Sequence, residues 1–174
     1  MINLQNKTPH LLVIGDLMVD QYLWGDCERI SPEAPIQIIN VDKENKLLGG
    51  AGNVINNLKV LGANVDVISV VGDCETSIEL KGLLNDIEVD TKYLVTQKNR
   101  ITSKKSRIIA AQQQVVRYDR ESSDEISVKS QDLILNSFIK IVANNEAVLL
   151  SDYGKGVLTN KLTQSLINIA NEHG

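Results

Sequence analysis

The sequence predicts an α/β fold in which a parallel sheet is flanked by helices and carries a small β lid. Three observations lead to this prediction. Short apolar runs alternate with segments of helical period, which is the pattern of a doubly wound sheet. Aromatic residues make up only 3% of the chain, so the core depends on Ile, Leu and Val, which suit strands buried on both faces. Two strand-rich segments interrupt the alternation, and we expect them to form the lid.

The first elements follow directly from hydrophobic period. Residues 11–14 are an apolar run that Gly15 and Asp16 end, as expected of a buried parallel strand. From residue 54 apolar residues recur at helical spacing up to Gly62, which is well placed to end that helix. A strand over residues 65–71 and a helix over 76–84 complete a βαβα unit.

The interruptions and the last elements divide the chain further. Residues 21–48 lack a helical period and contain Pro32, Pro35 and a β-rich run at 36–41. Further strands are predicted at 91–96, 106–110 and 113–119, then a helix at 130–142, a strand at 147–150 and a helix at 160–171. We therefore expect residues 1–174 to be one unit, with a core of residues 10–20, 49–91 and 120–174. The β lid would comprise residues 21–48 and 92–119.

Composition excludes several classes of protein. A net charge of −4 argues against wrapping nucleic acid, and no run approaches the roughly 18 apolar residues of a membrane span. The polar start of the chain has no secretory signal, so we expect a cytoplasmic protein with no membrane partner. Cys27 and Cys74 are expected to be reduced packing residues. The only histidines, His10 and His173, leave little for a histidine metal site or a Ser/His/Asp triad, and no metal ligands are assigned.

Polar residues gather where the predicted strands end. Asp16, Asp20, Asp73 and Asp152 lie at or just after such ends. Ligands of open α/β sheets bind outside the carboxyl ends of the strands. We therefore expect a site there, although Asp16 and Asp20 could instead be ordinary strand-end caps.

The segment Gly49-Gly50-Ala51-Gly52-Asn53 carries the most information. Its glycines let the backbone approach a ligand, and Asn53 offers both donors and an acceptor to sugar hydroxyls. An ordinary turn is the competing interpretation. A dinucleotide fingerprint is disfavoured because Ile55 stands at the third glycine position, and a P-loop at Gly154-Lys155-Gly156 is disfavoured because no Ser or Thr follows Lys155.

A basic cluster lies in this acidic chain, comprising Lys104, Lys105, Arg107 and Arg117. It could be a solvated strand face or a site that binds the phosphate of a substrate. The period of a strand puts Lys105 and Arg107 on one face, so we prefer these two, with Arg117 and Lys155 as further candidates.

Several motifs together resemble the PfkB/ribokinase-type carbohydrate kinases. Gly49, Gly50, Asn53, Gly62 and Gly72 match the spacing of a family signature, from which Ile55 departs. Other segments resemble the heptose 7-phosphate kinases within that family, although Gln112 replaces an expected Asn. These segments are Gly15 to Asp20, Arg29 to Pro35, Gln113 to Asp119 and Leu150 to Gly156.

The resemblance implies a ribokinase-like fold and a reaction. The γ-phosphoryl of Mg-ATP would pass to O1 of D-glycero-D-manno-heptose 7-phosphate, giving the 1,7-bisphosphate for lipopolysaccharide precursors. Asp16, Asp20, Asn53 and Asp152 would hold hydroxyls, and Gly49 and Gly50 would let the lid move. Lys105, Arg107, Arg117 and Lys155 remain the phosphate candidates.

The resemblance also implies what this chain lacks. The family's catalytic base is an Asp in a Gly-Ala-Gly-Asp turn, which we expect beyond Gly174. The chain is thus expected to be the N-terminal part of a kinase and inactive alone. A homodimer through the lid is expected. A kinase for another sugar, or a non-catalytic sugar-binding or dimerising module, remain alternatives.

Overall fold

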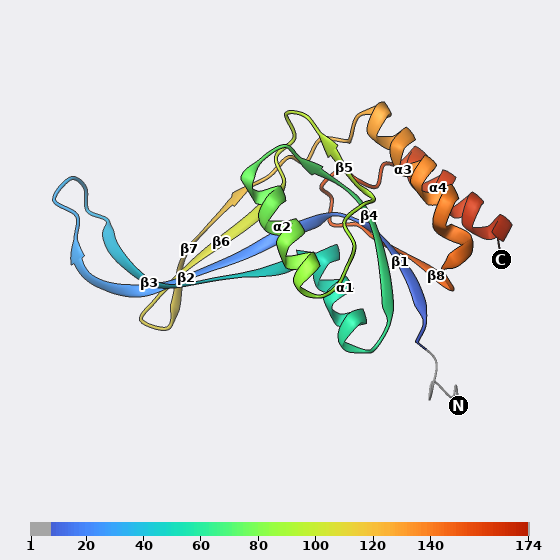
Figure 1. Cartoon of the computed structure of the whole chain (residues 1–174). Coiled ribbons are helices and arrows are strands. Elements are labelled where there is room, and N and C mark those ends of the chain that lie inside the picture. Colours follow the sequence, from blue (N-terminus) through green and yellow to red (C-terminus); the bar gives the residue numbers. More distant parts are fainter. Residues whose placement is uncertain (1–7, 174) are drawn as a thin grey trace.

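The computed structural model describes residues 8–173 and contains two four-stranded sheets (Figure 1). The core sheet has the strand order β5-β4-β1-β8, and the lid sheet has the order β3-β2-β6-β7. All neighbouring strands of the core sheet run parallel. The predicted α/β class, with a parallel sheet, flanking helices and a β lid, is confirmed. None of the helices in the described part of the chain is long and apolar enough to cross a membrane.

The core sheet is covered by helices on both faces. Its strands are β1 (His10–Gly15), β4 (Asn64–Gly72), β5 (Leu94–Gln97) and β8 (Ala147–Ser151). Helices α1 (Ala51–Val60) and α2 (Glu75–Asp86) pack on one face. On the other face lie α3 (Val128–Ile141), the short 3₁₀ helix η1 (Val142–Asn144) and α4 (Asn160–His173).

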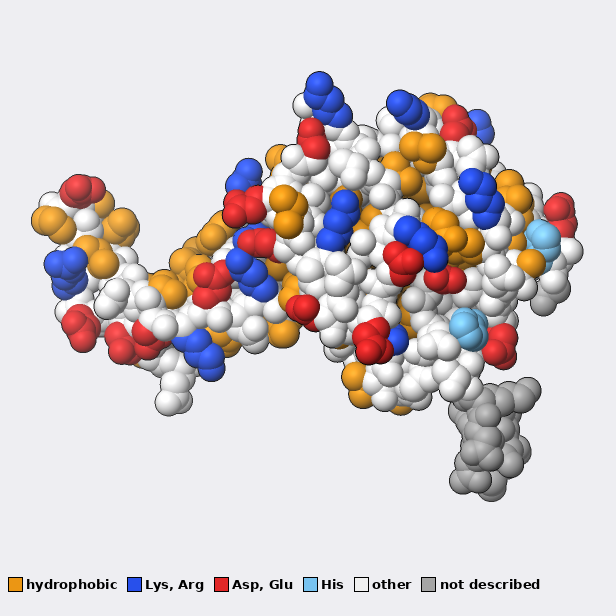
Figure 2. All heavy atoms as spheres, viewed as in Figure 1, with side chains coloured by type: hydrophobic (Ala, Val, Ile, Leu, Met, Phe, Trp, Pro, Cys, Tyr) orange, Lys and Arg blue, Asp and Glu red, His pale blue; other side chains and the backbone are white. Residues whose placement is uncertain are grey.

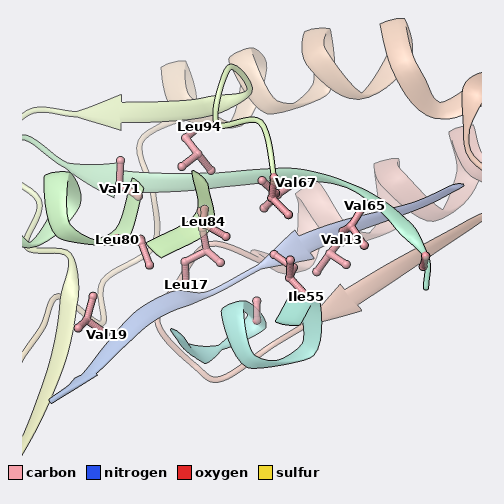
Figure 3. Close-up of a cluster of buried hydrophobic side chains, with 13 residues drawn as sticks. Val13, Leu17, Val19, Ile55, Val65, Val67, Val71, Leu80, Leu84 and Leu94 are labelled. Atoms are coloured by element: carbon pink, nitrogen blue, oxygen red, sulfur yellow. The ribbon is translucent and has the colours of Figure 1, made fainter. Parts of the chain in front are cut away.

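Side chains of β1 alternate between two hydrophobic clusters. Val13 packs with Ile55 of α1 and Leu80 of α2 in the cluster that Figure 3 shows. Leu12 and Ile14 point the other way and pack with α3 and α4. Burial on both faces explains why the strand reads as a continuous apolar run rather than as an alternating one.

Helix α1 ends as its sequence predicts. Gly62 has φ +91°, in the left-handed region, and its N–H donates to the carbonyl of Lys59 at 2.9 Å. Ile55, which replaces the small residue of the family signature, is fully buried in the core. The larger side chain is therefore accommodated by packing.

The lid is built from four strands, β2 (Leu17–Ile30), β3 (Gln37–Gly50), β6 (Ser103–Ala110) and β7 (Gln113–Arg120). Strand β2 pairs with β3 along its whole length but with β6 only from Met18 to Gly25. Beyond Gly25 the lid is thus a two-stranded ribbon, which projects furthest from the core in Figure 1.

Two of the expected lid boundaries were wrong. Residues 92–97 were expected in the lid, but β5 pairs with β4 and extends the core sheet. At the other boundary, β2 and β3 reach back to Leu17 and Gly50, residues that we expected in the core. The strand-rich composition that marked these segments does not tell which sheet a strand joins, because pairing is decided by partners distant in sequence.

Candidate functional site

A cavity of about 510 Å³ lies where the lid meets the core. Strands β2 and β3, helices α1 and α2 and the loop after β8 all contribute to its wall. Its lining residues are Asp20, Tyr22, Lys46, Leu47, Leu48, Gly50, Asn53, Asn56, Leu83, Asp86, Ile87 and Tyr153. Carboxylate, amide and aromatic groups in one concave site are suited to bind a polyhydroxylated ligand.

Gly49 and Gly50 form the junction between the lid and the core. A Cβ on Gly49 would lie 2.3 Å from a carboxylate oxygen of Asp20, so only glycine leaves room for that side chain. Gly50 has φ +56° and ψ −131° and caps α1, and a Cβ there would lie 2.5 Å from the carbonyl of Asp16. The glycine pair therefore lets β3 turn into α1 beside the cavity.

Asp16 is a positioning residue and does not line the cavity. It is only 1% exposed, and its carboxylate accepts three backbone hydrogen bonds, from the N–H groups of Tyr153, Lys155 and Val157, at 2.8, 3.0 and 3.1 Å. Its burial and these three donors suit Asp16 to holding the loop, and the expected contact with a substrate hydroxyl stays a prediction. The competing interpretation, a strand-end cap, describes its role.

The loop after β8 is held from a second side. The buried guanidinium of Arg100 donates to the carbonyls of Asp124, at 3.0 Å, and of Lys155. Burial lowers the pKa of Arg100, while the neighbouring Asp16 and Asp124 act in the opposite direction. Asp152, at the start of the loop, is exposed, and its carboxylate accepts the N–H of Gly154 at 2.8 Å. It stands next to Tyr153 of the cavity wall rather than in the wall itself.

The preferred cations lie on one face of β6, as the strand period predicts. Arg107 donates to a carboxylate oxygen of Asp20 at 2.5 Å and stacks over the ring of Tyr22, with 5.2 Å between the guanidinium carbon and the ring centroid. Lys105 lies 2.9 Å from a carboxylate oxygen of Asp119. Asp20 thus connects the basic face of the lid to the cavity that it lines.

Two further cations join the same row through acidic side chains. Arg117 binds Asp119 at 2.7 Å, and Glu121 lies 3.2 Å from Lys105 and 2.8 Å from Lys155. Because Lys105 lies on β6 and Lys155 on the loop after β8, Glu121 bridges the lid to that loop. We call Lys105, Arg107, Arg117 and Lys155 the cation row.

The acids of this network are held in their ionised form. Hydrogen bonds from Arg117 and then Lys105 hold the pKa of Asp119 far below its usual range. The pKa of Glu121 is also lowered, chiefly by the hydrogen bond from Lys155. For Lys105 burial lowers the pKa, but the hydrogen bonds that its ammonium group donates to Asp119 and Glu121 together outweigh burial and raise the pKa. These directions keep Asp119 and Glu121 ionised and Lys105 protonated at neutral pH.

The structure brings together part of the predicted site. Asp20, Gly50 and Asn53 line the cavity, and Gly49 packs against Asp20. The cation row adjoins it through Asp20, whereas Asp73 lies away from the lining, its carboxylate accepting the N–H of Asn99.

Sequence reasoning missed Tyr22, Asn56, Tyr153 and Glu121. Two of these had a usable signal: Tyr22 follows Asp20, and Glu121 follows Arg117 and Asp119, at strand spacing on one face. Asn56 and Tyr153 had none, because the fold decides which helix and loop face the cavity.

A magnesium ion would need several grouped oxygen ligands. Within residues 8–173, no three His, Cys, Asp or Glu side chains are grouped so that they could hold an ion. The residues around the cavity therefore do not fit a magnesium site by themselves, and we assign none of them to one.

Comparison with known proteins gives consistent results. Residues 8–174 match the profile described as "pfkB family carbohydrate kinase". The "Bifunctional protein HldE" of Aliarcobacter butzleri (strain RM4018) is 59% identical over 168 residues, which cover 97% of this chain and 35% of that protein. The protein of the same name from Sulfurimonas denitrificans is 55% identical over 171 residues, covering 98% of this chain and 36% of its own length.

A solved structure supports the fold. Arabidopsis thaliana ribokinase, solved with ribose and ATP, superposes with a TM-score of 0.61 at 16% identity, over 97% of this chain and 52% of the ribokinase. The chain thus spans about a third of the length of the curated relatives described above and about half of this kinase.

Proposed function

This chain belongs to the pfkB family of carbohydrate kinases, and from that premise we propose that it forms the sugar-binding part of a heptose kinase. The reaction would transfer the γ-phosphoryl of ATP to O1 of D-glycero-D-manno-heptose 7-phosphate, giving the 1,7-bisphosphate. We place this step in the cytoplasm, in the synthesis of lipopolysaccharide core precursors. The identity of over 50% to two proteins named HldE supports this choice among sugars.

One observation carries the proposal: a polar cavity adjoins the cation row, of which Lys155 lies on the loop after β8 and the other three members lie on the lid. In the cavity the carboxylate of Asp20 and the amide of Asn53 offer an acceptor and mixed donors to sugar hydroxyls. Asp152, exposed beside Tyr153, is a further candidate for a hydroxyl contact. A sugar bound here would lie against strand ends, where α/β proteins bind ligands.

The cation row suits the phosphate of such a substrate. Its four cations are paired with only three carboxylates, those of Asp20, Asp119 and Glu121. One positive charge is therefore left over, and an incoming phosphate can replace a carboxylate partner with stronger, charge-assisted hydrogen bonds. Lys105 and Arg107 are the best placed, since Arg107 already contacts the cavity residue Asp20.

In this mechanism the described residues bind and orient the sugar. Phosphoryl transfer depends mainly on positioning and on neutralising charge, which ATP-bound magnesium supplies in kinases. Asp20 and Asn53 would fix the ring so that one hydroxyl points to the γ-phosphoryl group. The lid would exclude water from that hydroxyl. The base that accepts its proton is assigned to no residue of this chain.

Binding of the phosphorylated sugar provides the test. Replacing Arg107 by Ala removes a bidentate donor, so the affinity for heptose 7-phosphate should fall by about 10- to 100-fold, the worth of one charged hydrogen bond. The affinity for unphosphorylated heptose should change much less. Titration calorimetry with both sugars measures the two effects separately.

A matched control removes the same positive charge from a different face of the lid. Arg120 lies on β7 next to Asp119 in sequence and therefore on the opposite face of the strand. Arg120→Ala should leave both affinities unchanged. Equal losses for the two sugars in Arg107→Ala would remove Arg107 from phosphate binding. Tighter binding of another sugar phosphate, such as a hexose phosphate, would transfer the proposal to a different substrate of the family.

We also propose that two copies of the chain associate through their lids. Strands β3 and β7 are the outer strands of the lid sheet, and such edges pair readily with another chain. Figure 2 shows hydrophobic side chains at the far end of the lid, where Ile30 and Ile36 are 70% and 61% exposed. Analytical ultracentrifugation should find a dimer. The double variant Ile30→Lys/Ile36→Lys should form a weaker dimer, which dissociates at a higher protein concentration than the unsubstituted dimer does. A monomer at all concentrations would contradict this proposal.

A further inference from the structure

A second ionic cluster lies at the base of the lid and joins it to the core. Glu79 of α2 is 2.7 Å from the ammonium nitrogen of Lys46 on β3 and 3.0 Å from that of Lys104 on β6. Lys46 is also 3.1 Å from Glu44. We call these four residues the root cluster. One side chain of the core thus holds two different strands of the lid.

Hydrogen bonds extend the root cluster across the lid sheet. Glu44 accepts from the amide of Gln21 on β2 at 2.7 Å, and Gln21 in turn accepts from the hydroxyl of Ser106 on β6 at 2.6 Å. Gln21 and Ser106 are buried. Three neighbouring strands are therefore connected to Glu79 through one continuous polar network, which is more rigid than isolated pairs.

Charge and burial show what the root cluster can do. Its two lysines and two glutamates are balanced, so it has no surplus charge with which to attract an anion. The side chains of Glu79 and Lys104 are only 19% and 18% exposed, so the loss of one partner would leave a charge in a partly desolvated place. The pKa of Glu79 is lowered, because the hydrogen bonds from Lys46 and Lys104 outweigh the opposing effect of its burial.

The place of the cluster is the decisive point. Lys46 stands four residues before Gly50, where β3 enters α1, and Lys104 is the second residue of β6. Rotation of the lid about this junction would separate both lysines from α2, which lies beside the base of the lid in Figure 1. Lys46 also lines the cavity, so the same contact fixes part of the cavity wall.

We propose that Glu79 is a positioning residue that sets the angle of the lid above the substrate cavity. It braces the lid against α2, while the bridge of Glu121 between Lys105 and Lys155 braces the opposite face of the lid. With Glu79 neutralised, the lid remains folded and attached through Glu121 but samples a wider range of angles. The importance of a fixed lid angle for catalysis rests on the proposed kinase function. The contact of Glu79 with the two lysines does not depend on that proposal.

The test measures the lid directly and needs no ligand. Spin labels are attached to cysteines that replace Glu33, which is exposed at the end of the lid, and Val60, which is 80% exposed on α1. The native Cys27 and Cys74 are changed to Ser so that labelling is confined to the two chosen positions. Double electron–electron resonance then gives the distribution of distances between lid and core.

Glu79→Gln should broaden this distribution, and amide hydrogen exchange at residues 44–48 and 103–106 should become roughly tenfold faster as the local brace is lost. Glu75→Gln is the control, since this substitution removes the same negative charge at an exposed position of α2. Lys104→Gln removes the partner instead and should reproduce the broadening. Unchanged distributions in both Glu79→Gln and Lys104→Gln would overturn the proposal, whatever sugar the protein binds.

Discussion

Asp16→Ala is expected to lower the free energy of unfolding by about 3 kcal/mol or more, since each buried donor left without an acceptor costs roughly 1–3 kcal/mol. The carboxylate of Asp16 accepts three backbone N–H groups of the loop after β8, and the residue is almost completely buried. Without it the loop loses its attachment to the end of β1. Tyr153 and Lys155, which this loop carries to the site, should then become mobile.

Chemical denaturation and amide exchange at residues 153–157 measure the two effects. Asp16→Asn is the sharper variant, because it keeps the shape but turns one acceptor into a donor that faces an N–H group. Asp152→Ala serves as the control, since Asp152 is exposed and accepts a single hydrogen bond from Gly154. An Asp16 variant as stable as Asp152→Ala would show that the loop does not depend on this carboxylate.

Gly50→Ala should be comparably damaging, with a loss of about 3 kcal/mol from backbone strain of roughly 1–3 kcal/mol and a steric clash. Gly50 has a positive φ, and a Cβ there would lie 2.5 Å from the carbonyl of Asp16 and 2.7 Å from the methyl group of Met18. A backbone carbonyl in the core cannot move aside as a flexible side chain could. The junction of lid and cavity should shift, and sugar affinity should fall with stability.

Two other glycines separate the effect of backbone strain from that of the steric clash. Gly154 also has a positive φ, of +67°, but nothing lies within 4 Å of its added Cβ, so Gly154→Ala should show the strain of about 1 kcal/mol without the clash. Gly82 lies within α2 in open space, and Gly82→Ala should stabilise the helix by about 0.5–1 kcal/mol. Unfolding midpoints that rank the three variants in another order would contradict the steric account of Gly50.

Hydrophobic period was sufficient to predict much of the fold. The strands β1, β4 and β8 and the four α-helices lie within a few residues of their expected places, because their buried faces repeat in sequence. Membership of a sheet was not predictable for β5. Its pairing with β4 depends on contacts between residues 69–72 and 94–97, which no local pattern encodes.

The candidate site divides in the same way. The sequence indicated that the glycines of residues 49–53 would let the backbone approach a ligand, because missing side chains are visible in a sequence. It could not distinguish a carboxylate that lines the cavity, as Asp20 does, from one that holds a loop, as Asp16 does. Asp16 directly follows β1 and Asp20 lies within β2, and the backbone N–H groups that donate to Asp16 come from a loop more than 130 residues further on. The same holds for Glu79, whose lysine partners come from two other strands.

The ribbon at the end of the lid has a consequence for how this protein can vary. From Asp26 to Ile30, β2 has β3 as its single partner, and a lone pair of strands has little stability of its own. Residues can thus be gained or lost at its tip with little effect on the cavity, which is formed by the other end of the same strands. By contrast, one residue inserted between Asp16 and Asp20 would move every side chain of β2 from there to the tip onto the opposite face of the sheet. Length is therefore free to diverge at one end of this hairpin and is constrained at the other.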